Sequence, residues 1–275
     1  MIGVMTNEDR HKQMAQAIGL FPMLQKRGKF LPRRVSIACY GPSLADTYKQ
    51  LKRPIISVSG AHDFLVYRGI IPDFHVDCDP RPHKPEMLRK PQEATTYLMA
   101  SVCHPLFWKA LQGRSVRLWH LINGDDLDTV AWVAQNHPDG MKSMIGGGSS
   151  VGQRAMNVAA ALGYRKFDIH GMDCSFTENR HAGAHTGSQQ VETLVKAGDR
   201  IFKTTKQMLQ TAIEMEHFLQ KQDAEVRFYG DGLMQETAKI LRGRHETRDS
   251  RLDERIIRGR NQREERGVFS SGAGA

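Results

Sequence analysis

Residues 146–152 read Gly-Gly-Gly-Ser-Ser-Val-Gly, and residues 167–173 read Phe-Asp-Ile-His-Gly-Met-Asp. Glycines let a backbone approach a ligand closely, and a helix N-terminus presents unpaired N–H groups to an anion. The segment between the two stretches, residues 153–164, is nearly all small and apolar, which is typical of a helix packed on a sheet. This order of loop, helix and acidic strand end predicts an α/β fold with a phosphate-binding loop. The alternative is a flexible loop before an ordinary core helix.

Short apolar runs alternate with helical or loop segments along the whole chain, which is typical of a mostly parallel sheet with helices on both faces. The expected strands are residues 35–40, 55–58, 74–77, 95–100, 116–120, 167–170 and 226–229. The expected helices are residues 43–52, 60–68, 104–111, 126–136 and 150–163. β-branched and aromatic residues flank Gly198-Asp199. We therefore favour a hairpin at residues 191–205 that is followed by a helix. The alternative is one long helix that runs to residue 221.

The composition indicates a cytoplasmic protein with one large α/β domain. The chain has 275 residues, of which 40% are hydrophobic. No stretch approaches the roughly 20 apolar residues of a membrane span, and the N-terminus lacks a signal-peptide pattern, so no membrane partner is expected. The four cysteines form no CxxC pair, which argues against a zinc ribbon or a disulfide scaffold.

Three segments are expected: a polar helical lead-in over residues 1–32, the α/β domain over residues 33–240, and a basic, disordered tail over residues 241–275. The tail has nine arginines and six acidic residues, within a chain of net charge +9. Its composition favours a solvated tail over an arm that binds nucleic acid. The sequence leaves the oligomeric state open.

Two glycine-containing turns are predicted to bind phosphate. The first, Gly41-Pro42-Ser43, follows the first expected strand, where the ligand crevice of an open parallel sheet lies. The second is the glycine loop itself. We expect both turns to cradle the phosphates of a nucleotide through their backbone N–H groups. The residues concerned are Gly41, Pro42 (which has no N–H and only shapes the turn), Ser43, Gly147, Gly148, Ser149 and Ser150. A plain capped turn is the alternative at residues 41–43.

Asp77 and Asp79 are candidate ligands for Mg²⁺. They close the third expected strand, and alternation puts both side chains on one side if the strand persists. Carboxylates that hold a divalent cation against phosphates are a recurring feature of phosphoryl transfer. The alternative is that Asp79-Pro80 only begins a turn.

His181 and His185 lie in a glycine-containing loop that follows Asp173. Two histidines beside an acidic residue are suited to act as a general base or to bind phosphate. A zinc site is not favoured, because a convincing third ligand is missing.

Several motifs, in their order and spacing, resemble a known domain over about residues 33–222. They are Gly41-Pro42-Ser43-Leu44, Ser59-Gly60-Ala61, Gly69-Ile70-Ile71-Pro72-Asp73, Asp77-x-Asp79-Pro80, Gly148-Ser149-Ser150-Val151 and Gly171-Met172-Asp173. Archaeal-type 6-hydroxymethylpterin diphosphokinases share this domain with the motility accessory factor glycosyltransferases of bacterial flagellins. The resemblance implies a Rossmann-like fold and, for the diphosphokinase type, transfer of a diphosphate from ATP to a pterin hydroxymethyl group with Mg²⁺.

A more distant similarity links residues 41–44 and 171–173 to bacterial sialyltransferases that use CMP-activated sugars. There a histidine downstream of the acidic strand end serves as the base, and the matching candidates are His185 and His181. One departure from the pattern is Tyr40, which follows Cys39 where family members commonly have Gly-Asn.

These observations predict a nucleotide-dependent transferase, with Asp173 and His185 placed to orient or deprotonate an acceptor hydroxyl. Diphosphate transfer from ATP is the leading reading. The alternatives are a glycosyltransferase that uses a CMP- or UDP-linked sugar, and a non-catalytic nucleotide-fold module that binds nucleic acid or a protein through its basic tail.

Overall fold

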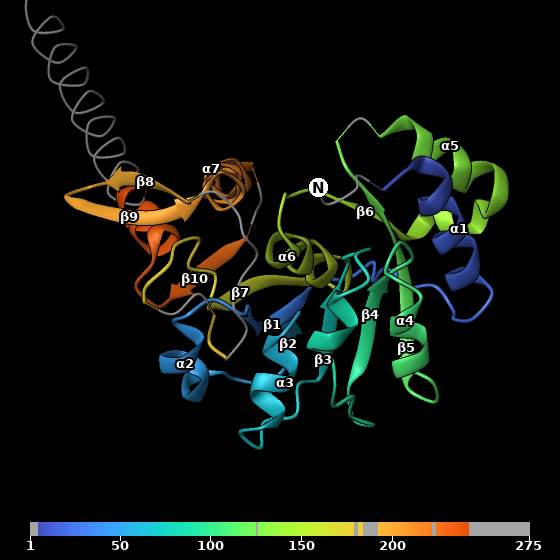
Figure 1. Cartoon of the computed structure of the whole chain (residues 1–275), viewed down its shortest axis with the longest axis horizontal. Helices are drawn as coiled ribbons and strands as arrows, with labels where there is room; N and C mark the ends of the chain where they lie inside the picture. Colours follow the sequence, from blue (N-terminus) through green and yellow to red (C-terminus); the bar gives the residue numbers. More distant parts are fainter. Residues whose placement is uncertain (1–4, 125, 179–180, 184–191, 222–223, 242–275) are drawn as a thin grey trace, which may run out of the picture.

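Eight parallel strands form one sheet at the centre of the molecule (Figure 1). The computed structural model describes residues 5–124, 126–178, 181–183, 192–221 and 224–241. The strand order is β10-β7-β1-β2-β3-β4-β5-β6. The strands are β1 (Leu31–Ala38), β2 (Ile55–Val58), β3 (Phe74–Asp77), β4 (Thr96–Ala100), β5 (Ser115–Ile122), β6 (Met144–Gly146), β7 (Tyr164–His170) and β10 (Glu225–Tyr229). The predicted α/β class is confirmed.

The strand order reverses direction between β1 and β7. From β1 the chain adds β2 to β6 on one side, then crosses back and adds β7 on the other side of β1. Ala38 pairs with His170, so the two strands end at the same level of the sheet. The strands that follow them in the sheet, β2 and β10, lie on opposite sides of this pair, and such a switch point is where open α/β sheets bind ligands.

Helices cover both faces of the sheet, as the sequence predicted. Figure 1 shows α2 and α3 on one face and α6 on the other. The α-helices are α1 (Asn7–Ile18), α2 (Leu44–Thr47), α3 (Ala61–Val66), α4 (Leu106–Ala110), α5 (Leu127–Asn136), α6 (Val151–Ala161) and α7 (Lys206–Lys221), and the 3₁₀ helices are η1 (Tyr48–Gln50), η2 (Lys84–Met87) and η3 (Pro138–Ser143). The helix expected at residues 43–52 is therefore two short pieces, α2 and η1.

The lead-in packs on the rest of the chain through α1. Met14 and Ala17 of α1 are buried in the main core, and Arg10 forms an ion pair with Asp126 at 2.7 Å. His11 stacks on Trp132 of α5, with ring centroids 5.1 Å apart. α1 is thus anchored beside α5 by both apolar and polar contacts.

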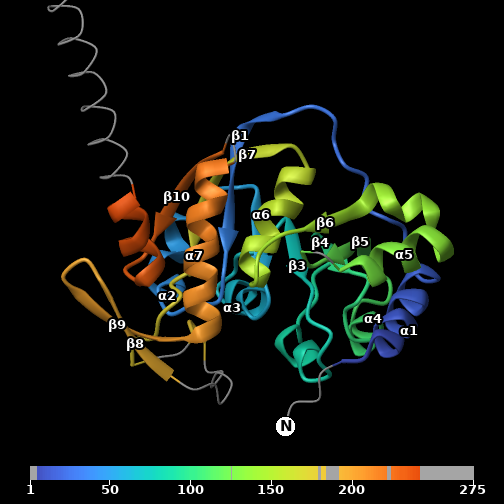
Figure 2. The same ribbon diagram turned by 90° about the horizontal axis from the view of Figure 1, so that it is seen from above.

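The hairpin expected at residues 191–205 is present as β8 (Glu192–Ala197) and β9 (Arg200–Thr205), and α7 follows it directly. Figure 2 shows α7 beside α6, where Gln153 donates a hydrogen bond to the carbonyl oxygen of Thr211 at 3.0 Å. Residues 242–275 lie outside the described part of the chain, so nucleic-acid binding by the tail stays a prediction.

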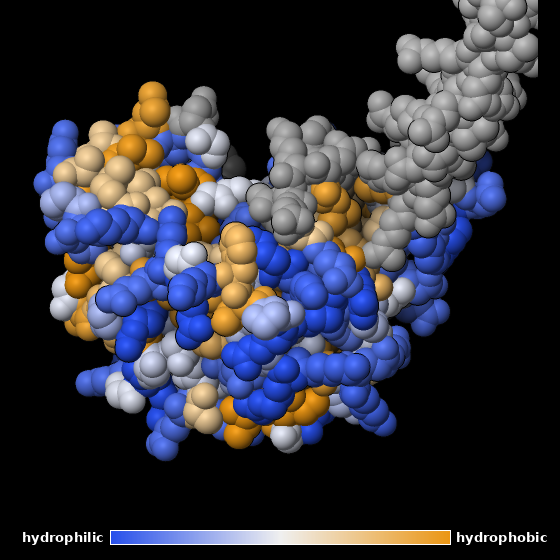
Figure 3. Space-filling view, turned by 180° about the vertical axis from the view of Figure 1, so that it is seen from behind, coloured by the Kyte–Doolittle hydropathy of each residue, from blue (hydrophilic) through white to orange (hydrophobic). Residues whose placement is uncertain are grey.

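The face seen in Figure 3 is largely hydrophilic, and apolar residues gather toward the end that carries α1 and α5. Leu20 and Leu127 are among the exposed large apolar side chains. Within the described ranges, no helix has both the length and the apolar character needed to cross a bilayer.

Replacement of Gly171 tests the close approach of β1 and β7 at the switch point. Gly171 has a φ of 67°, and a Cβ there would overlap the carbonyl oxygen of Cys39. We expect Gly171→Ala to lower the free energy of unfolding by about 3 kcal/mol, from left-handed strain and from overpacking. Gly69 has a φ of 75° in open space, so Gly69→Ala should cost only about 1 kcal/mol. Equal urea midpoints for the two variants would contradict this account.

Candidate active site

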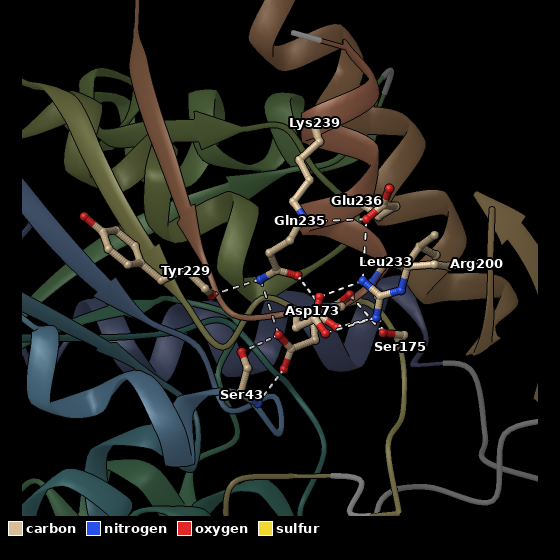
Figure 4. Close-up of polar contacts among 11 residues, drawn as sticks. Ser43, Asp173, Ser175, Arg200, Tyr229, Leu233, Gln235, Glu236 and Lys239 are labelled. Carbon is tan, nitrogen blue, oxygen red and sulfur yellow. Dashed lines mark hydrogen bonds and ion pairs between the residues drawn. The ribbon is translucent and has the colours of Figure 1, made fainter. Parts of the chain in front are cut away.

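Asp173 and Ser43 meet at the switch point between β1 and β7 (Figure 4). The Asp173 carboxylate accepts a hydrogen bond from the Ser43 backbone N–H at 2.8 Å and a second from the Ser43 hydroxyl. Gln235 Nε2 donates a third at 3.3 Å. Asp173 is only 4% exposed, and burial raises its pKa although the hydrogen bonds from Ser43 oppose that shift. A buried carboxyl with a raised pKa suits proton transfer.

The Gly41-Pro42-Ser43 turn can lie on Asp173 only because residue 41 lacks a side chain. A Cβ at Gly41 would stand 2.6 Å from Asp173 Oδ2. The Gly41 N–H donates to the Gly171 carbonyl oxygen at 2.8 Å, and the Pro42 carbonyl oxygen accepts from the Ala45 N–H in the first turn of α2. The structure therefore brings the predicted turn and the predicted acidic strand end into direct contact. The N–H groups of Gly41 and Ser43 already donate within the protein, so phosphate binding by this turn would have to displace these contacts and stays a prediction.

Asp77 and Asp79 have different surroundings because β3 ends at Asp77 and the alternation does not continue. Asp77 is buried, and its Oδ1 accepts from the N–H groups of Cys78 at 2.7 Å and Asp79 at 3.0 Å. Burial raises the pKa of Asp77 to about 6, against the attraction of Lys84. Asp79 is bound in a fork by Arg81 and lies 3.5 Å from Lys84 Nζ. Burial alone would raise the pKa of Asp79, but these cations hold it below its ordinary value.

These contacts leave few ligands for a metal ion. Of the four carboxylate oxygens, Asp77 Oδ2 alone has no hydrogen-bond or ion-pair partner among the described residues. No group of three His, Cys, Asp or Glu side chains suited to a metal occurs in that part of the chain either. In this arrangement Mg²⁺ finds one protein ligand here, and Asp79 would join it only after release from Arg81. The magnesium site stays a prediction.

The glycine loop follows β6 and leads into α6, as predicted, but acceptors from the protein already occupy the N–H groups of Ser149 and Ser150. Gly147 and Gly148 have φ values of 92° and 84°. The Ser149 N–H donates to Glu214 Oε2 of α7 at 2.7 Å and to Gln153 Oε1 at 2.9 Å. The Ser150 N–H donates to Gln153 Oε1 at 3.2 Å within a capping box. A phosphate bound by Ser149 would have to displace Glu214.

Arg154 links three strand ends to the first turn of α6. Its Nε donates to the Gly148 carbonyl oxygen at 3.1 Å, and its Nη2 donates to Asn123 Oδ1, just after β5, at 2.8 Å. Its Nη1 lies 3.3 Å from Cys78 Sγ, just after β3. Burial raises the pKa of the Cys78 thiol to about 11, even with Arg154 beside it.

The two histidine candidates have different outcomes. His181 stacks on Tyr40 with ring centroids 5.1 Å apart, and its Nδ1 lies 3.3 Å from the Tyr40 carbonyl oxygen. The Ala182 N–H also donates to that oxygen at 3.2 Å, so the loop after β7 folds over the end of β1. His185 lies outside the described residues, and its role stays a prediction.

The residues that sequence reasoning missed are Arg154, Gln235 and Glu214. A cation in the first turn of a helix opposes the macrodipole, so Arg154 directly after a glycine loop is a usable signal. Ser150-x-x-Gln153 is a capping-box signature that explains the internal acceptor. Glu214 comes from α7 and Gln235 from the segment after β10, and nothing local in the sequence places them here.

Comparison with known proteins bears on this arrangement. The family model described as 6-hydroxymethylpterin diphosphokinase MptE-like matches residues 10–179. The chain belongs to this MptE-like family. The match begins inside α1 and contains every predicted site residue except His181 and His185.

Among solved structures, the chain is similar to an MAf glycosyltransferase from Magnetospirillum magneticum AMB-1, with a TM-score of 0.64 and 19% sequence identity. The likeness covers 85% of this chain and 38% of that chain, so this MptE-like chain spans well under half of the neighbour. At this identity the likeness establishes the fold. No match was found among the curated proteins. The MptE-like family, which is named for a diphosphokinase, supports a transferase.

The raised pKa of Asp77 predicts an unusual pH dependence of stability. Between an unfolded pKa of about 3.9 and a folded pKa of about 6, the folded chain keeps a proton that the unfolded chain has released. The free energy of unfolding therefore falls as pH rises through this window, by up to about 3 kcal/mol from this residue. Asp77→Asn keeps both backbone hydrogen bonds and removes this loss of stability with rising pH. The stability of Asp77→Asn relative to wild type should therefore rise from about pH 4 to pH 7.

Asp79→Asn is the matched control, because the lowered pKa of Asp79 gives the opposite sign. Its stability relative to wild type should drop over the acidic range as pH rises. Urea unfolding at several pH values measures both differences. If the free energy of unfolding changes with pH in the same way for wild type and Asp77→Asn, the pKa of Asp77 is not raised in the folded chain.

Proposed function

We propose that this MptE-like chain is a nucleotide-dependent transferase of the diphosphokinase type, which moves a diphosphate from ATP to a hydroxymethyl group of a pterin-like acceptor. The observation that carries the proposal is the buried contact of Asp173 with the Gly41–Ser43 turn at the switch point. Family membership supports the reaction class. Ligands of open α/β sheets bind outside this pair of strand ends.

In this proposal the Ser43 turn and Asp173 share the reacting end of the site. The carboxylate fixes the turn through both Ser43 hydrogen bonds, and Gln235 fixes the carboxylate. An acceptor hydroxyl that replaces the Ser43 hydroxyl on Asp173 can give up its proton to the carboxylate, because burial favours the protonated form. His185 is a second candidate for the base, from the loop after β7.

Mg²⁺ is part of the proposal because a transferred diphosphate carries charge that a divalent cation neutralises. Asp77 is the residue that would hold it, with the donor phosphates supplying further oxygen ligands. The raised pKa of Asp77 means that metal binding below about pH 6 would release a proton.

A glycosyltransferase that uses a CMP- or UDP-linked sugar is the second candidate, favoured by the likeness to the MAf glycosyltransferase fold. Both candidates place a nucleotide at the same strand ends. They differ in the base and in the group transferred, so a nucleotide panel separates them.

The proposal predicts that ATP with Mg²⁺ raises the melting temperature more than CMP or UDP does, and that AMP is released when a hydroxymethylpterin is added. A larger shift with CMP or UDP selects the glycosyltransferase. If no nucleotide changes the melting temperature, both proposed functions are wrong.

Asp173→Asn tests the reacting residue. It keeps the side-chain shape and removes the base, so we expect kcat to fall about 10²- to 10⁴-fold with the fold retained. Asp168 is a matched control, because it is also buried on the same chain segment but pairs with Arg34 at 2.8 Å, away from the strand end. Asp168→Asn should lower stability and leave kcat within a few-fold of wild type. Equal losses of kcat in the two variants would remove Asp173 from the chemistry.

A further inference from the structure

Arg154 is a half-buried cation held only by neutral acceptors. Its three partners are a backbone carbonyl, an amide oxygen and a thiol. Within the described residues, it forms no ion pair with a carboxylate. A guanidinium fork matches phosphate oxygens in bidentate geometry, and a thiol is a weak acceptor that a phosphate oxygen readily replaces.

The glycine loop positions this arginine. The positive φ of Gly148 turns its carbonyl oxygen toward Arg154 Nε at 3.1 Å. The same loop has its Ser149 N–H bound to Glu214. The loop therefore orients Arg154 through its carbonyl oxygen, while the N–H groups of Ser149 and Ser150 are engaged within the protein.

Arg154 and the Ser43–Asp173 contact lie at the same edge of the sheet but at the ends of different strands. Gly152, in the same turn of α6, faces Met172 and Cys39 at the ends of β7 and β1; a Cβ there would stand 2.6 Å from Met172 Cε. Arg154 reaches from that turn to the residues after β3 and β5. β1 and β3 are two strand spacings apart, about 10 Å, so a ligand that touches both places is extended.

A second cation faces the same strand end. Lys84 Nζ lies 3.5 Å from Asp79, and its charge acts on the buried Asp77. Lys84 and Arg81 face the two carboxylates of Asp79 and Asp77, so the guanidinium of Arg154 supplies the positive charge in excess at the end of β3.

We propose that Arg154 binds a phosphate of the donor beyond the one attached to the nucleoside, so that the site selects donors with at least a diphosphate. This inference rests on the proposed function. It names the donor class as nucleoside di- or triphosphates and their derivatives, and it disfavours donors with a single phosphate. Arg154 leaves the Cys78 thiol and keeps Gly148 and Asn123 as its supports.

The test is calorimetric titration of AMP, ADP, ATP and inorganic pyrophosphate into wild type and Arg154→Gln. Wild type should bind ADP and ATP more tightly than AMP. Arg154→Gln should lose roughly 10- to 100-fold in affinity for ADP, ATP and pyrophosphate, the loss of a charged hydrogen-bonded pair, and only a few-fold for AMP.

Asn123→Asp provides a variant that keeps the arginine. It puts a carboxylate 2.8 Å from Arg154 Nη2 in place of a neutral oxygen. It should therefore weaken the binding of ADP and pyrophosphate as Arg154→Gln does, without a change in packing. It also keeps the inference testable if Arg154→Gln does not fold. Arg165 is the matched control, because backbone carbonyls of Ala160 and Tyr164 hold its guanidinium and it lies near the opposite end of β7. Arg165→Gln should leave every affinity within about two-fold.

The outcomes separate the two claims. Wild type that binds pyrophosphate through Arg154 but binds no nucleotide supports the phosphate site and removes the proposed function. Wild type that binds ADP with an affinity unchanged in both Arg154→Gln and Asn123→Asp overturns the role of Arg154 and leaves the function standing. Wild type that binds neither ADP nor pyrophosphate overturns both.

Discussion

Because β1 and β7 run parallel and in register up to Ala38 and His170, their two loops leave the sheet side by side and diverge. The Ser43 turn and Asp173 meet for that reason, and every other part of the site is placed relative to this pair. α6 lies against both strand ends through Gly152, and the first turn of α6 carries Arg154 toward β3 and β5. A shift of β7 by one residue would reverse the side-chain faces and separate Asp173 from Ser43.

Two buried carboxyls on one sheet edge are stabilised by different means, and this difference assigns them different tasks. Asp173 has donors on both oxygens, from Ser43 and Gln235, so its position is fixed. Asp77 has two backbone N–H groups on one oxygen only and a pKa near 6. A group that titrates near neutrality and keeps one oxygen unused suits exchange with a ligand or cation, whereas Asp173 holds the Ser43 turn in place and, in the proposed reaction, takes a proton only after an acceptor hydroxyl replaces the Ser43 hydroxyl.

Sequence patterns predicted most of this fold because its strands are short, apolar and buried on both faces, as in parallel sheets generally. β6 escaped notice since it has only three residues and ends in Gly146. For the site, motif residues at strand ends were predictable because strand ends converge. Glu214 and Gln235 were not, because each reaches the site from an element about 60 residues away along the chain, and local patterns contain no information on which distant side chain satisfies a given N–H group.

Glu214 gives the glycine loop a role that its composition alone does not suggest. A loop of glycines before a helix would normally attract an anion through its N–H groups, and here a carboxylate of the same chain supplies that anion from α7. Its charge is favourable at the helix N-terminus, and hydrogen bonds from Ser149 and Gln210 help to keep the pKa of Glu214 low even though burial opposes them. The Ser149 N–H is thus satisfied within the chain, and the Gly148 carbonyl oxygen faces Arg154. In the proposed binding mode a phosphate replaces the Cys78 thiol, and the guanidinium keeps Gly148 and Asn123 as its supports.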